Sequence, residues 1–400
     1  MLEAESILCF APDPWSDIWR NRHQIMSILA ERNRVMYVEP RTYLRQTVDM
    51  LRAGQLRWRD LGGERVTEVR PNLYVYHNLP YAPISGRFPL KQIGQAVRQS
   101  SLERQMRRLG FDAPILWLCR PEMSDLVGQF GEKLLLYHVV DEYSAYEGVS
   151  DPEVVRRREA AILERADLVL TTAPALWESK RRYNPNTHLV PNAVNYEAFA
   201  AAMQSDAPAP DDIASLPRPL VGYVGAINTK LDLSLFVALA ESHPEWTLVL
   251  VGPVRFPASD SLLQRLWQRE NVCFLGTKPV DDVPYYIKAL DVCLLPYRQN
   301  EWTRNISSLK LYEYLACGKP VVSSDVPAAR DYADLVAIAG DVGHFTTLVA
   351  DALRGGSDEE AARRMEVAGQ NTWRHRVAQI SELIETSLLS PGHSARSVAK

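Results

Sequence analysis

The chain contains no apolar run that approaches the roughly 20 residues needed to cross a bilayer, so we expect no membrane-spanning segment. Its first residues, MLEAESILCF, carry acidic side chains where a signal peptide carries basic ones, and we therefore expect a cytoplasmic protein. The chain also has no internal repeat of roughly 20–50 residues and no low-complexity tract, which argues against a repeat architecture.

Cysteine is scarce, and its spacing does not suggest a metal site. The five cysteines are isolated, odd in number and mostly set in apolar runs: Cys9, Cys119, Cys273, Cys293 and Cys317. Because no two of them have the short spacing of metal-binding pairs, we interpret them as reduced thiols in the core of a cytoplasmic protein. This pattern excludes a small scaffold held together by disulfides.

The net charge of −4 is small for 400 residues, but it is unevenly distributed. Residues 41–108 contain thirteen basic and five acidic side chains, a local net charge of +8, so the remainder sums to −12. Leu, Trp and Phe lie among these cations, which suggests a face attracted to an anionic membrane surface or to a phosphorylated acceptor. A solvated helical surface explains the region nearly as well. No recognition motif accompanies the charge, so we expect no nucleic-acid partner.

Short apolar runs alternate regularly with helical patterns in the second half of the chain. The expected strands are residues 219–227, 247–252, 271–276, 291–297, 320–324 and 335–340. The expected helices are residues 231–242, 259–269, 281–290, 308–317 and 328–333. Fully apolar strands separated by helices imply a parallel sheet covered on both faces, and ligands of such sheets bind beyond the carboxyl ends of the strands.

The first half repeats this scheme less regularly. Its expected strands are residues 6–12, 34–40, 114–121, 133–142 and 167–173, and its expected helices are residues 20–32, 90–109, 152–165 and 175–183. We therefore expect an α/β protein with two Rossmann-like doubly wound domains facing across a cleft. The expected parts are an N-terminal domain (1–200), a linker rich in Asp, Ala and Pro (201–218), a C-terminal domain (219–365), a helix packing back towards the N-terminal domain (366–390) and a flexible tail (391–400).

The most informative segment is NISSLKLYEYLACGKPVVSS, which predicts a helix that begins at Ser307 or Ser308 and ends at Gly318. Lys310 falls in its first turn, where the helix dipole disfavours a cation by roughly 0.3–1 kcal/mol. An anion held by the two serines and the free N–H groups of that turn would reverse this effect. Glu313 lies three residues later on the same helical face. This arrangement suits a nucleoside diphosphate, whereas an ordinary surface helix with a Lys–Glu pair is the alternative.

Two side chains near the end of the apolar run LLLYHVV could act on a proton in the first half of the chain. Asp141 follows the run, where a carboxylate can orient an acceptor hydroxyl or take its proton. His138 is the rival base because histidine titrates near neutrality. Strand alternation equally allows His138 to be buried beside the sheet.

Further polar and aromatic candidates for the acceptor side of the cleft follow the first strand and the run PILWLC. They are Trp15, Asp17, Arg20, His23 and Arg120. Of these, the guanidinium after WLC has the charge and geometry to reach a phosphate or an acceptor carboxylate.

The order of the motifs VGYVGAINTK, LVLVGP, NVCFLGTK, DVCLLPY and SSLKLYEYLACGKPVVSS resembles the nucleotide-sugar domain of the GT-B glycosyltransferases. Among them it is most similar to the retaining family-4 type, the glycosyl transferases group 1 enzymes of cell-surface polysaccharide synthesis. The pieces VMYVEP, HVVDEYSAY, ERADLVLTTAPAL and VPNAVNYEAF are similar to the acceptor half. The resemblance covers residues 6 to about 380. It implies a UDP- or GDP-sugar donor, a glycan or lipid-linked glycan acceptor, and neither a cofactor nor a protein-bound metal.

The resemblance also assigns donor-binding residues in the second half. Glu313 matches the family glutamate that hydrogen-bonds the ribose hydroxyls, and Ser308, Leu309 and Lys310 match the loop whose amides and cation hold the diphosphate. Gly225 matches the glycine whose missing side chain lets the backbone approach the donor phosphates.

Other matches include two departures from the family pattern. Gly276, Thr277 and Lys278 stand where the family's base-binding backbone lies. Asn305 occupies the position of the first family glutamate, and we expect its amide to bond a donor-sugar hydroxyl. The family arginine after the glycine loop is absent, which leaves Lys230 as its substitute.

The resemblance implies retention, with Lys310, the helix N-terminus and Lys230 stabilising charge on the departing diphosphate. If the reaction inverts instead, Asp141 or His138 becomes an obligatory base. Two other functions are compatible with the sequence: a nucleotide-sugar 2-epimerase, and a non-catalytic degenerate transferase subunit, which Asn305 and the missing arginine suggest. For a transferase we expect a peripheral position on the inner membrane face.

Overall fold

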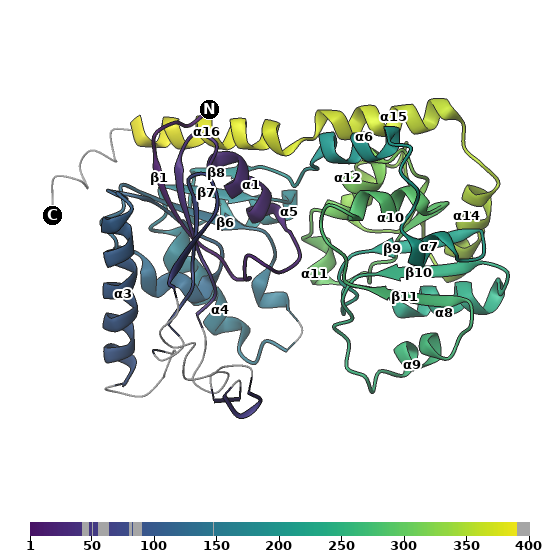
Figure 1. Cartoon of the computed structure of the whole chain (residues 1–400), viewed down its shortest axis with the longest axis horizontal. Helices are drawn as coiled ribbons and strands as arrows, with labels where there is room; N and C mark the ends of the chain where they lie inside the picture. Colours follow the sequence, from purple (N-terminus) through teal and green to yellow (C-terminus); the bar gives the residue numbers. More distant parts are fainter. Residues whose placement is uncertain are drawn as a thin grey trace. The chain divides into compact units, whose positions relative to one another are not determined.

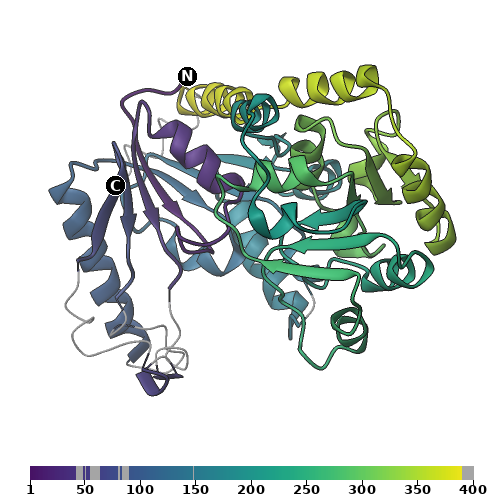
Figure 2. The ribbon, with the colours of Figure 1, turned by 45° about the vertical axis from the view of Figure 1, so that its right-hand side comes forward.

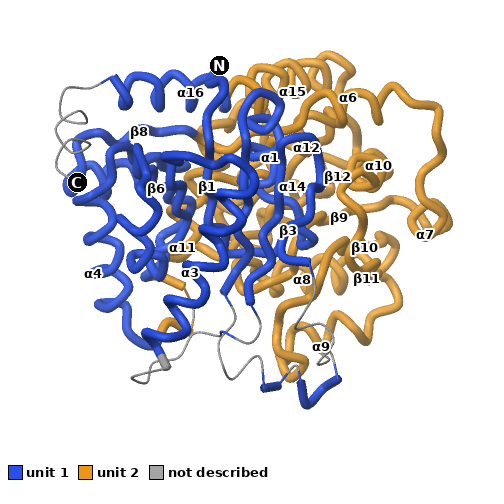
Figure 3. The backbone as a smooth tube through the Cα atoms, turned by 60° about the vertical axis from the view of Figure 1, so that its left-hand side comes forward, with its two compact units in different colours: residues 1–144, 150–190, 377–400 blue, residues 145–149, 191–376 orange. Residues whose placement is uncertain are grey.

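The computed structural model describes residues 1–41, 48–49, 51–54, 64–79, 82, 90–146 and 148–389. The chain divides into two compact units, which Figure 3 distinguishes by colour. The first unit comprises Met1–Ser144, Ser150–Val190 and Val377–Lys400, and the second comprises Ala145–Val149 and Pro191–Arg376. Much of the basic region 41–108 and the whole of the expected tail 391–400 lie outside the described residues.

The first unit is built on an eight-stranded sheet with the order β3-β4-β2-β1-β5-β6-β7-β8. Only β3 and β4 pair antiparallel; the other neighbours pair parallel. The strands are β1 (Ser6–Phe10), β2 (Arg34–Val38), β3 (Val66–Arg70), β4 (Leu73–Tyr76), β5 (Ile115–Leu118), β6 (Leu134–Val139), β7 (Leu168–Thr171) and β8 (Thr187–Leu189). β5, β6 and β7 are buried along their whole length, as in parallel sheets with both faces covered.

Helices surround this sheet (Figure 1). They are α1 (Asn21–Leu29), α3 (Leu90–Arg108), α4 (Pro152–Leu163), α5 (Pro174–Lys180) and the 3-10 turns η2 (Pro121–Leu126) and η3 (Tyr143–Ala145). Local sequence explains where α4 begins, because the Asp151 side chain accepts a hydrogen bond from Val154 N and a proline occupies the first turn.

Three strands of the first unit were not expected from the sequence. β3 and β4 form a hairpin whose turn places Asn72 at a φ of +63°, a conformation that asparagine tolerates. Four of the five β3 residues are exposed, so its charged sequence resembles a solvated surface rather than a buried strand. β8 is only three residues long and is equally hard to detect.

The second unit is built on a six-stranded, entirely parallel sheet with the order β11-β10-β9-β12-β13-β14. Its strands are β9 (Leu220–Val224), β10 (Thr247–Val251), β11 (Val272–Gly276), β12 (Val292–Leu295), β13 (Val321–Ser324) and β14 (Ala337–Ala339). All six correspond to the expected apolar runs. With the first sheet, they confirm the α/β class and the two parallel-sheet domains.

The helices of the second unit cover both faces of its sheet (Figure 2). They are α6 (Tyr196–Gln204), α7 (Asp211–Ala214), α8 (Leu233–Ser242), α9 (Ser261–Trp267), α10 (Val283–Ala289), α11 (Glu301–Arg304), α12 (Leu309–Ala316), α13 (Pro327–Arg330), α14 (Val342–Leu353) and α15 (Asp358–Gln370). Contacts group α8, α9 and α14 together, and group α6, α10, α12 and α15 together. The carboxyl ends of the strands between these two layers carry the loops described below.

The boundary between the units differs from the expected one. The second unit begins at Pro191, and the segment expected to be a linker contains α7 and the end of α6. Phe199 is 7% exposed and Ile213 is fully buried, so these helices belong to the core of the second unit. Because the segment is rich in proline, the sequence suggested a linker and did not reveal that these two apolar side chains are buried.

The described part of the chain ends in two helices, because a break at Asn371 separates α15 from α16 (Trp373–Leu389). Residues 377–389 of α16 belong to the first unit. Across the described ranges, each helix is too short or too polar to cross a membrane. All five cysteines are free, and four of them are buried, as their apolar surroundings in the sequence indicate.

Candidate functional site

The informative segment of the second unit forms the expected helix. Ser308 is the N-cap of α12, and its Oγ accepts a hydrogen bond from Leu311 N at 3.4 Å. Gly318, at a φ of +65°, follows the last turn. The N–H groups of Leu309 and Lys310 have no acceptor within the helix, since an α-helix leaves its first N–H groups unpaired. This helix start therefore offers two N–H donors beside a cation.

Lys310 and Glu313 form an ion pair at this helix start. Lys310 Nζ lies 2.9 Å from Glu313 Oε2, and the two side chains are 19% and 18% exposed. The carboxylate offsets the unfavourable position of a cation near the positive end of the helix dipole. The pair remains accessible, so an arriving anion can compete with Glu313 for the ammonium. The structure thus brings together the two residues on which the sequence hypothesis depends.

Gly225 adjoins this ion pair. It follows β9 directly, and a Cβ added to it would lie 2.8 Å from Lys310 Cε and 2.8 Å from the Tyr223 hydroxyl. Its φ of +156° is a further reason for glycine here. Gly252, after the neighbouring strand β10, is even more constrained, because its added Cβ would lie 2.0 Å from Gly225 O. Both strand ends therefore lack side chains, and the end of β9 lies beside the lysine.

The two serine hydroxyls are less available than the sequence suggests. Ser308 is only 6% exposed, and its Oγ lies 3.1 Å from the Tyr297 hydroxyl as well as capping the helix. Ser307 Oγ accepts from Asn192 N at 3.1 Å, while the Asn192 amide donates to Ser307 O at 2.7 Å. Both hydroxyls hold the loop in place. We therefore expect an anion to contact the backbone N–H groups at the start of α12 rather than these two hydroxyls.

Lys230 and Asn305 lie on neighbouring loops of the second unit. Lys230 Nζ lies 5.2 Å from the centre of the Trp302 ring, a cation–π arrangement, and its carbonyl accepts from Arg298 N at 2.8 Å. Asn305 ends α11, and its amide nitrogen donates to Glu301 O at 2.7 Å. One N–H of the Asn305 side-chain amide is therefore engaged with its own helix.

Gly276 and Thr277 are exposed at the end of β11, as the resemblance requires of a base-binding backbone. Gly276 has a φ of +70°, and its carbonyl accepts from Gly252 N at 2.8 Å. The next residue, Lys278, pairs with Asp212 at 2.5 Å. The ends of β9, β10 and β11 are thereby joined through backbone contacts.

In the first unit the two candidate bases have different surroundings. Asp141 follows β6 and is half-buried. His138, within β6, is 2% exposed, and its ring lies edge-on to Trp117 at 5.6 Å. Burial and the charge of Arg22 lower the pKa of His138 to about 3. The structure therefore places His138 in the core as a neutral ring, whereas Asp141 is partly exposed at the end of the strand.

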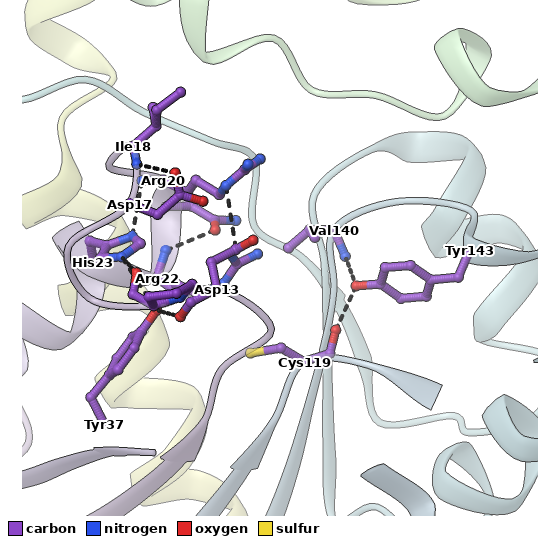
Figure 4. Close-up of polar contacts among 12 residues, drawn as sticks. Asp13, Asp17, Ile18, Arg20, Arg22, His23, Tyr37, Cys119, Val140 and Tyr143 are labelled. Atoms are coloured by element: carbon purple, nitrogen blue, oxygen red, sulfur yellow. Dashed lines mark hydrogen bonds and ion pairs between the residues drawn. The ribbon is translucent and has the colours of Figure 1, made fainter. Parts of the chain in front are cut away.

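His23 is also an interior residue. Its side chain is fully buried, its Nδ1 accepts from Arg20 N at 3.1 Å, and its Nε2 lies 3.4 Å from Pro14 O (Figure 4). These contacts close the start of α1 in the manner of a capping box. Burial and the charge of Arg22 lower its pKa to about 4. The expectation that His23 lines a cleft is wrong, because its ring completes the helix cap.

Asp13, which the sequence did not single out, organises the loop before α1. Its carboxylate pairs with Arg22 and lies 3.3 Å from Arg20 Nε. Trp15 and Asp17 are half-buried in the same loop, where Trp15 N donates to Glu39 Oε1 at 3.0 Å and Asp17 caps its own turn. Two arginines at the start of a helix that follows an apolar strand indicate a nearby carboxylate, and this charge pattern could have identified Asp13.

Arg120 follows β5 and stacks on an aromatic ring. Its guanidinium carbon lies 4.8 Å from the centre of the Tyr143 ring, and its Nε lies 3.4 Å from Glu122 Oε2. The Tyr143 hydroxyl donates to Cys119 O at 2.7 Å and accepts from Val140 N at 3.4 Å (Figure 4). Tyr143 therefore ties together the ends of β5 and β6, next to Arg120 and Asp141.

The sequence analysis also did not predict a buried ionic network next to β6. Lys180 Nζ lies 2.7 Å from Glu142 Oε2 and 2.8 Å from Glu159 Oε2, and Tyr137 donates to Glu159 Oε1 at 3.1 Å. Burial raises the pKa of Glu159 despite the opposing charge of Lys180. The pKa of Glu142 is lowered, because its burial is outweighed by Lys180. The described residues hold no group of three His, Cys, Asp or Glu side chains arranged for a metal ion.

Comparisons with known proteins support the resemblance. Residues 218–354 match the family model described as Glycosyl transferases group 1. The chain is 32% identical over 182 residues to TuaH of Bacillus subtilis (strain 168), named as a teichuronic acid biosynthesis glycosyltransferase; the match covers 44% of this chain and 45% of TuaH. The chain therefore spans less than half the length of this curated relative.

Solved structures share the fold over nearly the whole chain. Sucrose-phosphate synthase from Thermosynechococcus elongatus aligns with a TM-score of 0.69 at 19% identity, covering 96% of this chain and 98% of that one. Anabaena Alr3699/HepE in complex with UDP and glucose aligns with a TM-score of 0.66 at 18% identity, covering 95% and 99%. These likenesses confirm the expected GT-B fold.

Proposed function

We propose that this chain, which has the GT-B fold and carries a glycosyl transferases group 1 domain over residues 218–354, transfers a sugar from a nucleoside-diphosphate sugar to an acceptor. The acceptor is a glycan or a lipid-linked glycan of the cell surface, and the configuration at the transferred carbon is retained. The teichuronic acid assignment of TuaH supports a polysaccharide product, and the UDP complex of the Anabaena protein supports a nucleotide donor.

The observation that carries the proposal is the Lys310–Glu313 pair at the start of α12, beside the bare backbone of Gly225. A diphosphate at this place replaces Glu313 as the partner of the ammonium and accepts hydrogen bonds from the first N–H groups of the helix. Glu313 is thereby released to accept hydrogen bonds from the ribose hydroxyls. The ion pair thus holds both donor-binding groups in position until the donor arrives.

Transfer breaks the bond between the sugar and the diphosphate and forms a bond from the sugar to the acceptor oxygen. Lys310, the helix N-terminus and Lys230 stabilise the negative charge that develops on the departing diphosphate. The proton of the acceptor hydroxyl passes to that diphosphate, which leaves on the face that the acceptor attacks. Asp141, at the carboxyl end of β6, orients the acceptor hydroxyl.

The proposal includes a peripheral position at the cytoplasmic face of the inner membrane. Helix α3, in the basic region, carries five basic residues and one acidic residue, and attraction of such a helix to anionic lipid weakens as salt rises. Co-sedimentation with anionic vesicles at low and high salt tests this part of the proposal, and no binding at low salt would contradict it.

Calorimetric titration of the purified protein with UDP, GDP and ADP tests donor binding. We expect one nucleotide to bind selectively, and we expect Glu313→Ala to abolish or strongly weaken that binding because the ribose loses its acceptor. Glu366→Ala, an exposed glutamate on α15 of the same unit, is the matched control and should bind as the wild type does. Unchanged affinity in Glu313→Ala removes the ribose assignment.

A further inference from the structure

We propose that three buried tyrosines of the second unit, Tyr223, Tyr297 and Tyr314, are positioning residues for donor binding. Their hydroxyl groups hold the loop after β9 and the start of α12 at the spacing at which both can contact one diphosphate. The inference rests on the proposed function and deepens it, because it gives a role to residues that the family resemblance does not assign. All three side chains are at most 5% exposed, so they act through the groups that they hold.

Tyr314 joins α12 to the last residue of β9. The N–H of Gly225 donates to a carbonyl of β10 at 2.7 Å, so the preceding N–H, that of Val224, points away from β10 and towards β12. The pairing of β9 with β12 ends at Gly222. Beyond this point the Tyr314 hydroxyl accepts from Val224 N at 2.9 Å, in place of a strand carbonyl. The helix is thereby fixed to the residue that precedes Gly225.

Tyr223 and Tyr297 form a second link between the same two parts of the chain. The Tyr223 hydroxyl lies 3.4 Å from Ala226 O, and a Cβ added to Gly225 would lie 2.8 Å from that hydroxyl. The Tyr223 hydroxyl also forms a hydrogen bond with the Tyr297 hydroxyl. Tyr297 in turn lies 3.1 Å from the Oγ of Ser308, the N-cap of α12. These contacts lead without a break from the glycine loop to the start of the helix.

The three hydroxyls are neutral at physiological pH. Burial raises the pKa of Tyr297 to about 12, and it raises the pKa values of Tyr223 and Tyr314 well above their ordinary value. The nearby charge of Glu313 further raises the pKa values of Tyr223 and Tyr297. A neutral hydroxyl can donate one hydrogen bond and accept another, so it can join groups on two loops. Satisfied networks of this kind make a buried region rigid.

A diphosphate has to meet two separate parts of the chain, namely Lys310 with the first N–H groups of α12, and the backbone at Gly225. Parts that are held at the correct spacing before binding lose less freedom when the donor arrives. Groups held in place in this way also stabilise the charge of the departing diphosphate. Phenylalanine would serve core packing alone, whereas each of these hydroxyls meets a group at the end of β9, in the loop after it or at the helix start.

The test is calorimetric titration of the full chain with UDP, GDP and ADP, and the variants are titrated with the nucleotide that the wild type binds most tightly. Tyr314→Phe and Tyr297→Phe keep the buried rings and remove one hydroxyl each. We expect each variant to bind the nucleotide about tenfold more weakly, because a buried polar partner is lost and the two parts of the site are no longer held together.

Tyr312→Phe is the matched control. Tyr312 lies on the same helix and is 5% exposed, but its hydroxyl accepts from that of Tyr332 at 3.0 Å, outside the network. Thermal melting reports the stability of each variant. The affinity of Tyr312→Phe for the nucleotide should stay within about twofold of the wild type, as expected for an independent site.

A double-variant cycle with Gly225→Ala separates positioning from a general loss of stability. Gly225→Ala already displaces Lys310 from the loop, so adding Tyr314→Phe should weaken binding by less than about threefold more. Additive losses would overturn the proposal. So would equal affinities in Tyr314→Phe, Tyr297→Phe and Tyr312→Phe.

If Tyr314→Phe does not fold, the response of Tyr297→Phe decides. Nucleotide binding by the wild type that neither of these variants weakens would refute the inference and leave the proposed function intact. Failure of the wild type to bind any of the three nucleotides would refute the proposed function and the inference together.

Discussion

The α-carbon of Gly225 faces the side chain of Lys310 so closely that an added Cβ would lie 2.8 Å from Lys310 Cε. A glycine loop and a lysine that are far apart in the sequence are thereby in contact beside the start of α12. This relationship brings the loop after β9 and the start of the helix together, as the proposed donor site requires, and it can be tested with a single methyl group.

Gly225→Ala should weaken nucleotide binding by about tenfold or more, because the methyl displaces the lysine and the φ of +156° becomes strained at a cost of about 1–3 kcal/mol. Calorimetry with UDP and thermal melting measure the two effects. Gly340→Ala is the control: it follows β14, and a Cβ there would meet nothing within 4 Å. Wild-type affinity in Gly225→Ala would show that the loop does not touch the donor.

Lys310→Ala should lower kcat by about a hundredfold, with a smaller loss in donor affinity, because the ammonium acts mainly on charge that develops during transfer. Lys310→Arg, which keeps the charge, should recover part of the rate. Steady-state kinetics together with calorimetry separate turnover from binding. Equal losses in both would argue against a role in the transition state.

Free nucleoside diphosphate should appear only when an acceptor accompanies the nucleotide sugar. A transferase needs the acceptor hydroxyl to complete the reaction, whereas a nucleotide-sugar 2-epimerase converts its substrate alone. Diphosphate release is measured with and without a lipid-linked glycan fraction, alongside chromatography of the nucleotide sugar. Conversion of the sugar without acceptor would favour the epimerase, and no turnover despite tight nucleotide binding would favour a non-catalytic subunit.

The stability of the protein should fall as the pH is lowered from about 6.5 towards 4. His23 and His138 have folded pKa values of about 4 and about 3, below the ordinary value of 6.5, because both are buried near Arg22. In this window the unfolded chain binds protons that the folded chain does not, so the contribution is complete above pH 6.5 and is lost on acidification. Each histidine changes the free energy of unfolding by up to about 1.4 kcal/mol per pH unit in this window.

Urea unfolding at a series of pH values measures this dependence. His138→Phe, which can still pack against Trp117, should flatten the slope between pH 6.5 and 4. His344→Gln, at an exposed position in the second unit, is the control and should leave the slope as in the wild type. An unchanged slope in His138→Phe would mean that this ring is not held neutral in the fold.

Lys180→Met should destabilise the first unit by about 3–5 kcal/mol, because it leaves Glu142 and Glu159 buried without their shared cation. Adding Glu159→Gln should restore part of that loss by removing one of the unpaired charges. Denaturant melts of the single and double variants form the cycle. Additive losses in the double variant would contradict the proposed coupling.

The sequence predicts the second sheet better than the first. Its strands are short runs of Val, Ile and Leu with turn residues on both sides, and burial on two faces requires this composition. The β3–β4 hairpin was not predicted, because most of β3 faces solvent and its charged residues do not show the alternation of apolar and polar residues expected of a strand. α6 was not predicted, because the prolines that follow it suggested a linker, although its Phe199 is buried in the core. Solvent exposure and neighbouring composition, rather than missing apolar residues, obscured these elements.

The candidate site, like the fold, could be predicted from the sequence only in part. Lys310 and Glu313 could be predicted because helix periodicity fixes residues three apart on one face. The contact of Gly225 with Lys310 could not, since it depends on how two loops meet in space. His23 was misinterpreted because the same ring can titrate in a cleft or cap a helix, and only its burial decides. Asp13 was overlooked although it forms ion pairs with both Arg20 and Arg22.

The assignment of Ala145–Val149 to the second unit gives the chain an interwoven connectivity. The polypeptide passes between the units after Ser144, after Val149, after Val190 and after Arg376. Cleaving the backbone within residues 201–218 therefore cannot yield two complete units. A truncated gene that ends in this segment would encode the first unit without α16. Expression of the second unit by itself calls for residues 191–376, without the five residues Ala145–Val149.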